Sequence, residues 1–391
     1  MSARTDRGSR AGLGLPSFPW DSLSAFAVRA RAHPDGIVDL SVGSPIDPTP
    51  VVIRDALTAA ADAHAYPQTA GSAQLCAAIV DWFQRRRGVP GLTAAEVMPT
   101  IGSKELIAGL ALWLGLGPGD VVVQPELAYP TYAVGAALAG ASVHTGDDPA
   151  HWPPNTALVW LNSPGNPDGR VLGIDQLRVA VERARELGAV IVSDECYAEL
   201  AWEADSTVSI LDDRVTGTDR RGVLAVYSLS KQSNLAGYRA GIVAGGDELI
   251  AEILGVRRNL GLIPPAPVQA AMVAALSDDD HVAAQKEIYR RRRALLAPAL
   301  QAAGFRIDQS EAGLYLWATR GEDAWDTVAA MAELGILVVP GTFYGEENSR
   351  HVRVALTASD ERIGVATRRL GTLANKSRDV LADVTVDPRA N

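Results

Sequence analysis

The chain has 391 residues, 47% of them hydrophobic, and 36 Lys and Arg residues against 46 Asp and Glu residues give a net charge of −10. This length and composition predict a globular protein of two or three domains. The acidic balance argues against a nucleic-acid-binding surface, and we interpret the three arginines at 85–87 as the solvated end of a helix. Lysine is scarce, so amine chemistry has four candidates: Lys104, Lys231, Lys286 and Lys376.

Cysteine, histidine and apolar runs exclude several further classes. Cys76 and Cys196 make neither a disulfide framework nor a zinc spacing, and the six histidines are scattered, so no metal site is expected. The polar start of the chain lacks the apolar stretch of a signal peptide, and the longest apolar run, 106–116, is too short to span a bilayer. We therefore expect a protein of the reducing cytoplasm that is not attached to a membrane.

The first 48 residues are expected to hold a tail, an arm and part of a small domain. Residues 1–14 are polar and predicted to be disordered. Residues 15–21 carry two prolines and two aromatics, which predicts an extended docking arm rather than a helix. Residues 37–41 alternate like a strand. We expect the arm and part of a small domain over 15–48.

Residues 49–267 form the predicted large domain. After helices at 50–63 and 72–88, short β-rich runs alternate with helical stretches between 97 and 245. This is the rhythm of a mostly parallel sheet with helices on both faces. A proline-rich joint at 261–267 closes the domain. The expected strands are at 121–123, 157–161, 190–193 and 223–227, and the expected helices at 129–139 and 176–187.

The pattern changes after the joint, which predicts a smaller α+β domain over 268–375. A long charged helix covers 278–302, and the rest mixes strands with two more helices. A polar tail at 376–391 is expected to be flexible. The expected strands are at 305–307, 315–318, 336–339 and 352–355, and the expected helices at 324–334 and 360–373.

Polar side chains follow three of the predicted parallel strands, at the sheet edge where such folds bind ligands. Lys231 follows the strand at 223–227, and its amine could bind a carbonyl compound, while Ser228, Ser230 and Arg239 offer donors for a phosphate. Asp194 ends another strand, where a carboxylate can hold a pyridine nitrogen protonated. Each feature also has a plain structural reading, as a surface lysine or as a strand-end aspartate that caps a turn.

The ordered set of motifs resembles the fold-type I aminotransferases that use pyridoxal 5'-phosphate. Its parts are Asn166-Pro-x-Gly, then Asp194-x-x-Tyr197, then Ser228-x-Ser230-Lys231, and finally Arg239. The resemblance covers about 15–373 and implies that family's α/β fold. It also implies that Lys231 forms the Schiff base with the cofactor and moves the proton, that Asp194 pairs with the ring nitrogen, and that Asn166 and Tyr197 bind the ring hydroxyl.

The same resemblance assigns further residues. The loop Gly102-Ser103-Lys104 would bind the cofactor phosphate together with Ser228, Ser230 and Arg239, at the start of a helix. Tyr129 would stack on the ring, and Tyr66 would reach the phosphate of a partner subunit, which implies a homodimer with its active site at the interface. Arg353 would clamp the substrate carboxylate through its planar fork, and Gly43 would let that carboxylate approach.

Finer features resemble the actinobacterial N-succinyldiaminopimelate aminotransferases of lysine biosynthesis. They are the arm at 15–21, the loop at 341–345, and Arg257 and Arg258 followed by the prolines at 264–267. This implies amino transfer from glutamate to N-succinyl-2-amino-6-oxopimelate. An aminotransferase of aspartate, aromatic or LL-diaminopimelate type and a β-lyase on the same scaffold remain alternatives.

Two other sequence features give weaker support for a functional prediction. Arg257 or Arg258 could bind a second substrate carboxylate, but we favour solvated helix residues outside the site. The glycines at 115–119 lack the third glycine and the strand-to-helix setting of a dinucleotide fingerprint, which disfavours a nicotinamide oxidoreductase.

Overall fold

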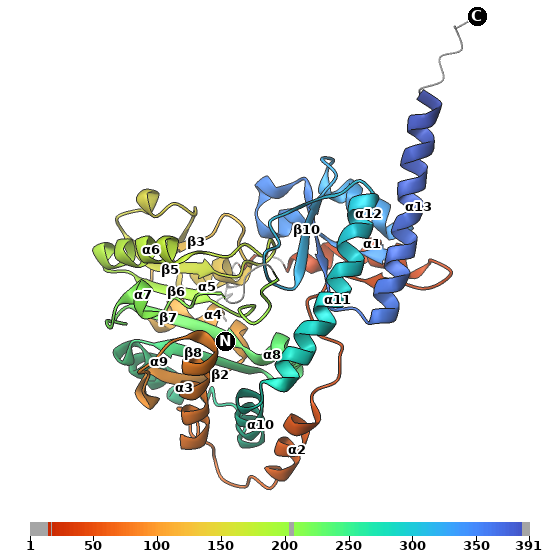
Figure 1. Cartoon of the computed structure of the whole chain (residues 1–391). Helices are drawn as coiled ribbons and strands as arrows, with labels where there is room; N and C mark the ends of the chain where they lie inside the picture. The colour runs from red at the N-terminus through yellow and green to blue at the C-terminus, as the bar shows by residue number, and fades with distance from the viewer. Residues whose placement is uncertain (1–14, 17, 203–206, 385–391) are drawn as a thin grey trace, which may run out of the picture.

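The structure is a computed structural model, and it describes residues 15–16, 18–202 and 207–384. The tail predicted at 1–14 and the end of the chain from 385 lie outside the described residues. Figure 1 shows two bodies, each built around its own sheet, with the C-terminal helix extending away from them.

The larger sheet has seven strands in the order β2-β8-β7-β6-β5-β3-β4 (Figure 1). β8 runs antiparallel to both of its neighbours, and the other neighbouring pairs are parallel. The central strands are almost wholly apolar because both of their faces are covered. The strands are β2 (Val97–Ile101), β3 (Val121–Gln124), β4 (Ser142–Thr145), β5 (Thr156–Asn162), β6 (Val190–Asp194), β7 (Val223–Ser228) and β8 (Ala240–Gly245).

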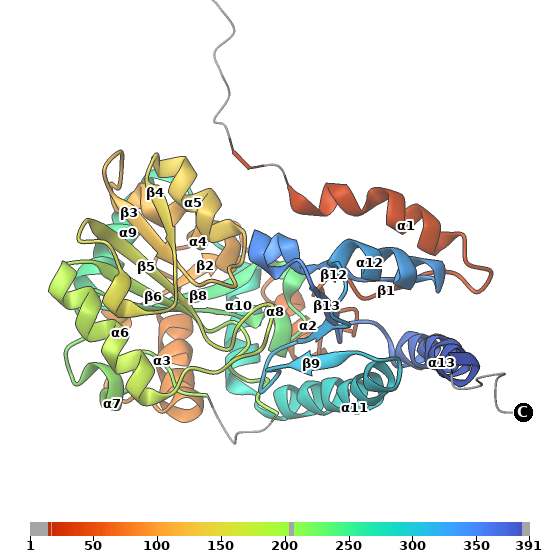
Figure 2. The same cartoon turned by 90° about the horizontal axis from the view of Figure 1, so that it is seen from above.

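Helices pack on both faces of this sheet, as Figure 2 shows from above. Successive strand residues point to opposite faces, so Ile191 joins one core cluster and Val192 the other. One cluster includes residues of α3 (Ala73–Arg87), α6 (Ile174–Leu187), α7 (Asp213–Thr216) and α10 (Ala266–Ser277), and α2 (Val51–Ala59) packs on α10. The other includes residues of α4 (Gly102–Trp113), α5 (Thr131–Ala139) and α9 (Asp247–Leu260).

The second body holds a four-stranded antiparallel sheet in the order β12-β13-β10-β9 and a parallel pair, β1 with β11. α1 packs on α12, and α11 packs on α13 (Figure 2). The strands are β1 (Val38–Asp39), β9 (Arg306–Asp308), β10 (Tyr315–Thr319), β11 (Ile336–Leu337), β12 (Val339–Pro340) and β13 (His351–Ala355). The helices are α1 (Ser24–Arg31), α11 (Asp280–Ala302), α12 (Ala324–Glu333) and α13 (Asp360–Val384).

The predicted fold class is confirmed: a mostly parallel sheet with helices on both faces, plus a smaller α+β part. The predicted domain limits stay a prediction, and α10, which begins at the predicted joint, packs against α2 and α3 of the larger body.

The ends of the described chain differ from the sequence expectations. Pro19–Leu23 forms a 3-10 turn, η1, where an extended arm was predicted, because proline fits a first helical position and Ser22 Oγ donates to Pro19 O over 2.6 Å. At the other end, α13 continues to Val384, so 376–384 is helical where a flexible tail was predicted. That segment contains neither proline nor glycine, so no residue in it breaks the helix.

Two arginine predictions were wrong. Arg87, expected at a solvated helix end, is buried with its Nη2 3.0 Å from Glu195 Oε2. Arg257, also expected to be solvated, is fully buried, bonds Glu105 and donates to Leu262 O over 2.9 Å. In both cases a carboxylate partner offsets the cost of removing the guanidinium from water.

None of the helices in the described ranges is both long and apolar enough to cross a membrane.

Candidate active site

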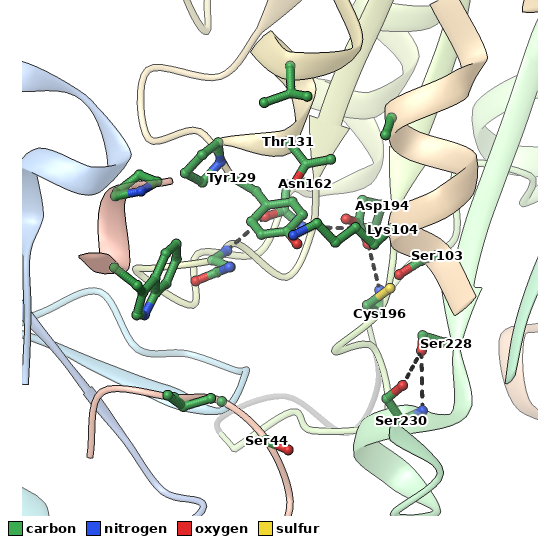
Figure 3. A pocket seen from close by; sticks show the side chains of 18 of the residues that line it. Ser44, Ser103, Lys104, Tyr129, Thr131, Asn162, Asp194, Cys196, Ser228 and Ser230 are labelled. Atoms are coloured by element: carbon green, nitrogen blue, oxygen red, sulfur yellow. Dashed lines mark hydrogen bonds between the residues drawn. The ribbon is translucent and has the colours of Figure 1, made fainter. Parts of the chain in front are cut away.

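A cavity of about 740 Å³ opens at the carboxyl edge of the seven-stranded sheet and is closed on its other side by the smaller body and the arm. Every residue predicted for the site lines it except Gly102 and Tyr66. The topology explains this result, because the ends of β5, β6 and β7 and the start of antiparallel β8 meet at one sheet edge. Figure 3 shows Tyr129, Asp194, Ser228 and Ser230 around the same open space.

One end of the cavity gathers donors for an anion. Ser228 ends β7, and its hydroxyl lies 2.9 Å from Ser230 Oγ and accepts the Ser230 N–H over 3.2 Å (Figure 3). Arg239 holds a left-handed backbone, with φ 55°, just before β8. A Cβ at Gly102 would lie 2.4 Å from Arg239 Nη2, so this glycine lets the guanidinium reach the first turn of α4. Hydroxyls, a guanidinium and a helix N-terminus together suit a phosphate.

Asp194 ends β6 and is buried with neutral hydrogen-bond partners. Its Oδ2 accepts the Tyr132 hydroxyl over 3.0 Å, and its Oδ1 accepts the Cys196 N–H over 3.2 Å. Burial raises the pKa of Asp194, and these hydrogen bonds, with a smaller contribution from Lys231, oppose the rise. The buried carboxylate therefore has room for a cationic partner on its cavity side.

Lys231 lies on α8 (Leu229–Gln232), one short turn after β7. Its ammonium donates to the carbonyl of Gly43, which belongs to the segment after β1. The amine therefore reaches across the cavity, from the larger body toward the smaller one.

Arg353, in β13, is buried at the side of the cavity formed by the smaller body. Its Nη2 donates to Ser41 O over 2.6 Å and its Nη1 to Asn166 Oδ1 over 3.0 Å, while its Nε has no partner among the described residues. The guanidinium carbon lies 3.9 Å from the ring centroid of Tyr315. This leaves a buried cation without a carboxylate partner in the described part of the chain.

Lys104 and Tyr66 lie away from the phosphate-like end. Lys104 Nζ lies 5.4 Å from the centroid of the Phe18 ring, against the N-terminal arm rather than beside the serines. Tyr66 is 98% exposed and stays outside the cavity of its own chain. Tyr129 lines the cavity, and burial raises the pKa of its hydroxyl.

Sequence reasoning missed two tyrosines at this site. Tyr132 bonds Asp194 and stacks on Trp160, with ring centroids 5.0 Å apart. Tyr315 Oη lies 3.1 Å from Tyr197 Oη. Tyr129 lies just before α5 and Tyr132 in its first turn, and their rings meet edge to face with centroids 5.8 Å apart, so the short spacing between them was a usable signal. Tyr315 has no local signal, since its position depends on how the two bodies pack.

Comparison with known proteins supports the kind of site that this geometry indicates. A family model described as class I and II aminotransferases matches residues 35–370. The chain belongs to the class I and II aminotransferases, which depend on pyridoxal phosphate and act on amino acids and oxo acids.

Particular relatives are similar over nearly the whole chain. A probable aminotransferase of Mycobacterium tuberculosis is 57% identical, over 95% of this chain and 88% of its own. The 4-dedimethylamino-4-oxo-anhydrotetracycline transaminase of Streptomyces rimosus is 54% identical, over 91% of this chain and 99% of its own. The solved N-succinyldiaminopimelate aminotransferase of Mycobacterium tuberculosis has a TM-score of 0.81 at 29% identity, covering 90% of this chain and 96% of its own.

Proposed function

We propose that this chain transfers the amino group of glutamate to an oxo acid, with Lys231 as the residue that binds pyridoxal phosphate and moves the substrate proton. The observation that carries this proposal is one cavity lined by an amine, a buried carboxylate without a charged partner, and a cluster of anion donors. When bound, the cofactor supplies a sink for the electrons left by the departing α-proton. The Lys231 amine would accept that proton and return it to the carbonyl-derived carbon of the cofactor.

The remaining cofactor contacts are proposed from the residues that line the same cavity. Asp194 would hold the ring nitrogen in its protonated form, and that positive charge would pair with the buried carboxylate. Asn166 Oδ1 accepts from Arg353, so the amide nitrogen of Asn166 is left to donate to the ring hydroxyl of the cofactor. The hydroxyl of Tyr197 would donate to the same oxygen. Tyr129 would cover one face of the ring. The start of α4 at Gly102 and Ser103 would hold the phosphate, together with Ser228, Ser230 and Arg239.

Arg353 binds the substrate α-carboxylate. Its guanidinium is positioned by Ser41 and Asn166, and its Nε has no partner among the described residues. A carboxylate accepts from such a planar fork in a bidentate way. Gly43, the other residue predicted for the carboxylate, has no room for a side chain, because the Tyr315 hydroxyl occupies the place of a Cβ. We also propose that the protein is a homodimer, in which the exposed Tyr66 reaches the phosphate end of the partner subunit's cavity.

The acceptor is proposed to carry a second carboxylate far from the reacting carbon. Among the described residues, four cations line the cavity: Lys104, Lys231, Arg239 and Arg353. Three of them have the roles given above, and Lys104, which lies against Phe18, is left for a distal carboxylate. Glutamate and N-succinyl-2-amino-6-oxopimelate both have one, and the similarity to the N-succinyldiaminopimelate aminotransferase supports this acceptor.

Replacing Lys104 with alanine tests the acidic acceptor. We expect kcat/KM for glutamate and N-succinyl-2-amino-6-oxopimelate to fall about 10- to 100-fold, mostly through KM, because one charge-assisted hydrogen bond is lost. The value for alanine, which has no distal carboxylate, should change little. Equal losses for alanine and glutamate would instead assign Lys104 to the cofactor phosphate.

A bulky apolar acceptor is a second candidate, favoured by the arm. One wall of the cavity is apolar and is formed by the arm residues Leu15, Pro16, Phe18, Pro19 and Trp20. In addition, the name of a 54% identical relative gives an oxo-anhydrotetracycline as the compound it transaminates. Assaying the pyridoxamine form of the enzyme against both oxo compounds separates the two. Preference for the polycyclic ketone over N-succinyl-2-amino-6-oxopimelate would replace the acidic acceptor.

A further inference from the structure

Two tyrosines join the two bodies inside the cavity. Tyr197 follows β6 in the larger body, and Tyr315 lies in β10 of the smaller one. Their hydroxyl oxygens are 3.1 Å apart, and the two rings meet edge to face with centroids 5.6 Å apart. Both side chains are buried. The contact is therefore a direct hydrogen bond, shielded from water, between elements that belong to different sheets.

The chain makes space for the Tyr315 hydroxyl. A Cβ at Gly43 would lie 1.9 Å from that oxygen and 2.7 Å from the ring carbon that carries it. Any residue other than glycine at position 43 would therefore force Tyr315 to move. Gly43 is also the residue whose carbonyl accepts from Lys231, so the hydroxyl sits beside the reacting amine.

Arg353 lies against the other side of the pair. Its guanidinium carbon is 3.9 Å from the centroid of the Tyr315 ring, a cation–π contact made by the same residue that we assign to the substrate carboxylate. The ring of Tyr344 also faces this guanidinium, at 5.2 Å, and its buried hydroxyl has no partner among the described residues. Tyr315 thus differs from Tyr344 in that its hydroxyl makes a hydrogen bond.

The number of hydrogens in the pair indicates which hydroxyl donates. Each phenol carries one hydrogen, and in the proposed function Tyr197 gives its own to the cofactor, so Tyr315 is the donor to Tyr197. Burial raises the pKa of Tyr315, but the Arg353 and Lys231 cations hold it below its ordinary value. Burial and the neighbouring Tyr315 raise the pKa of Tyr197 well above its ordinary value. The titratable groups that act on Tyr315 are Cys196, Tyr197, Lys231 and Arg353, and Tyr129, Tyr289 and Tyr344 also interact with it.

We propose that Tyr315 is a positioning residue that donates a hydrogen bond to Tyr197, and so connects Arg353 in the smaller body to the phenolic oxygen of the cofactor. The inference rests on the proposed function. With its oxygen lone pair occupied by Tyr315, Tyr197 turns its own hydrogen toward the cofactor and donates more strongly. That donation favours the deprotonated phenolic oxygen. A carboxylate bound to Arg353 would alter the charge against the Tyr315 ring, so the relay would respond to substrate.

The test is the pH dependence of the visible absorption of the cofactor-loaded enzyme. Tyr315→Phe keeps the ring over Arg353 and removes only the hydroxyl, and we expect the pH midpoint to rise by about half a unit, as for one neutral hydrogen bond. Tyr344→Phe, which loses a hydroxyl without a partner, should keep the parent midpoint. Tyr197→Phe should raise it further than Tyr315→Phe does.

The double variant decides whether the effect passes through Tyr197. If it does, Tyr197→Phe with Tyr315→Phe has the same midpoint as Tyr197→Phe alone. An unchanged midpoint in Tyr315→Phe, or an equal further rise in the Tyr197→Phe background, would overturn the relay while the enzyme still transfers amino groups. A parent enzyme without visible absorption after cofactor loading would instead overturn the proposed function, and the relay with it.

Discussion

Replacing Lys231 with alanine is expected to lower the rate of amino transfer by about four orders of magnitude or more, because one amine both binds the cofactor and moves the proton. The alanine variant should also lose the visible absorption that the parent shows with bound cofactor. The measurement is a single-turnover reaction with glutamate, followed by the release of 2-oxoglutarate.

Lys231→Arg is the matched control for this prediction, since it keeps a cation at the site but cannot bind a carbonyl carbon as an amine does. It should be as inactive as the alanine variant. A small primary amine added to Lys231→Ala should restore part of the proton transfer and so separate lost chemistry from lost folding. Parent-like turnover in Lys231→Ala would refute the assignment.

Replacing Asp194 with alanine is expected to lower kcat by about a thousandfold, since the cofactor ring then loses the carboxylate that keeps its nitrogen protonated. The carboxylate is buried with neutral donors from Tyr132 and Cys196, and among the described residues that line the cavity it is the one acidic group, so no other carboxylate there can compensate. The measurement is kcat in the cofactor-saturated variant, with cofactor binding followed separately.

A cofactor analogue and a second carboxylate sharpen this test. Pyridoxal phosphate methylated on its ring nitrogen carries a permanent positive charge, and the space left in Asp194→Ala admits the methyl group, so activity should partly return. Asp168→Asn removes a buried carboxylate that lies outside this cavity, and its kcat should stay within about threefold of the parent. Failure of the methylated cofactor to restore any activity would argue against the charge role of Asp194.

Strand-end positions were predictable from the sequence because they depend on local order. Asn166, Asp194 and Lys231 each lie just beyond a run of apolar, β-forming residues, and a parallel sheet brings such ends to one edge. The order of the motifs then indicated the family, and the fold class with it.

Contacts between the two bodies could not be read in the same way. The Tyr315–Tyr197 bond and the position of Lys104 against Phe18 depend on how a sheet, a helix and an arm far apart in the sequence come together. Arg87 and Arg257 were misread because exposure was inferred from charge, while their carboxylate partners lie more than a hundred residues away along the chain. Tyr132 could have been predicted, since it follows Tyr129 by three residues and their rings are in contact.

The most direct test of the account follows the two half-reactions by absorption. Glutamate added to the cofactor-loaded protein should bleach the visible band and release one 2-oxoglutarate per bound cofactor, and N-succinyl-2-amino-6-oxopimelate should then restore the band. Restoration by another oxo compound alone would change the acceptor and leave amino transfer in place. A band that glutamate does not bleach, or pyruvate and ammonia formed from a cysteine conjugate without amino transfer, would contradict the central claim.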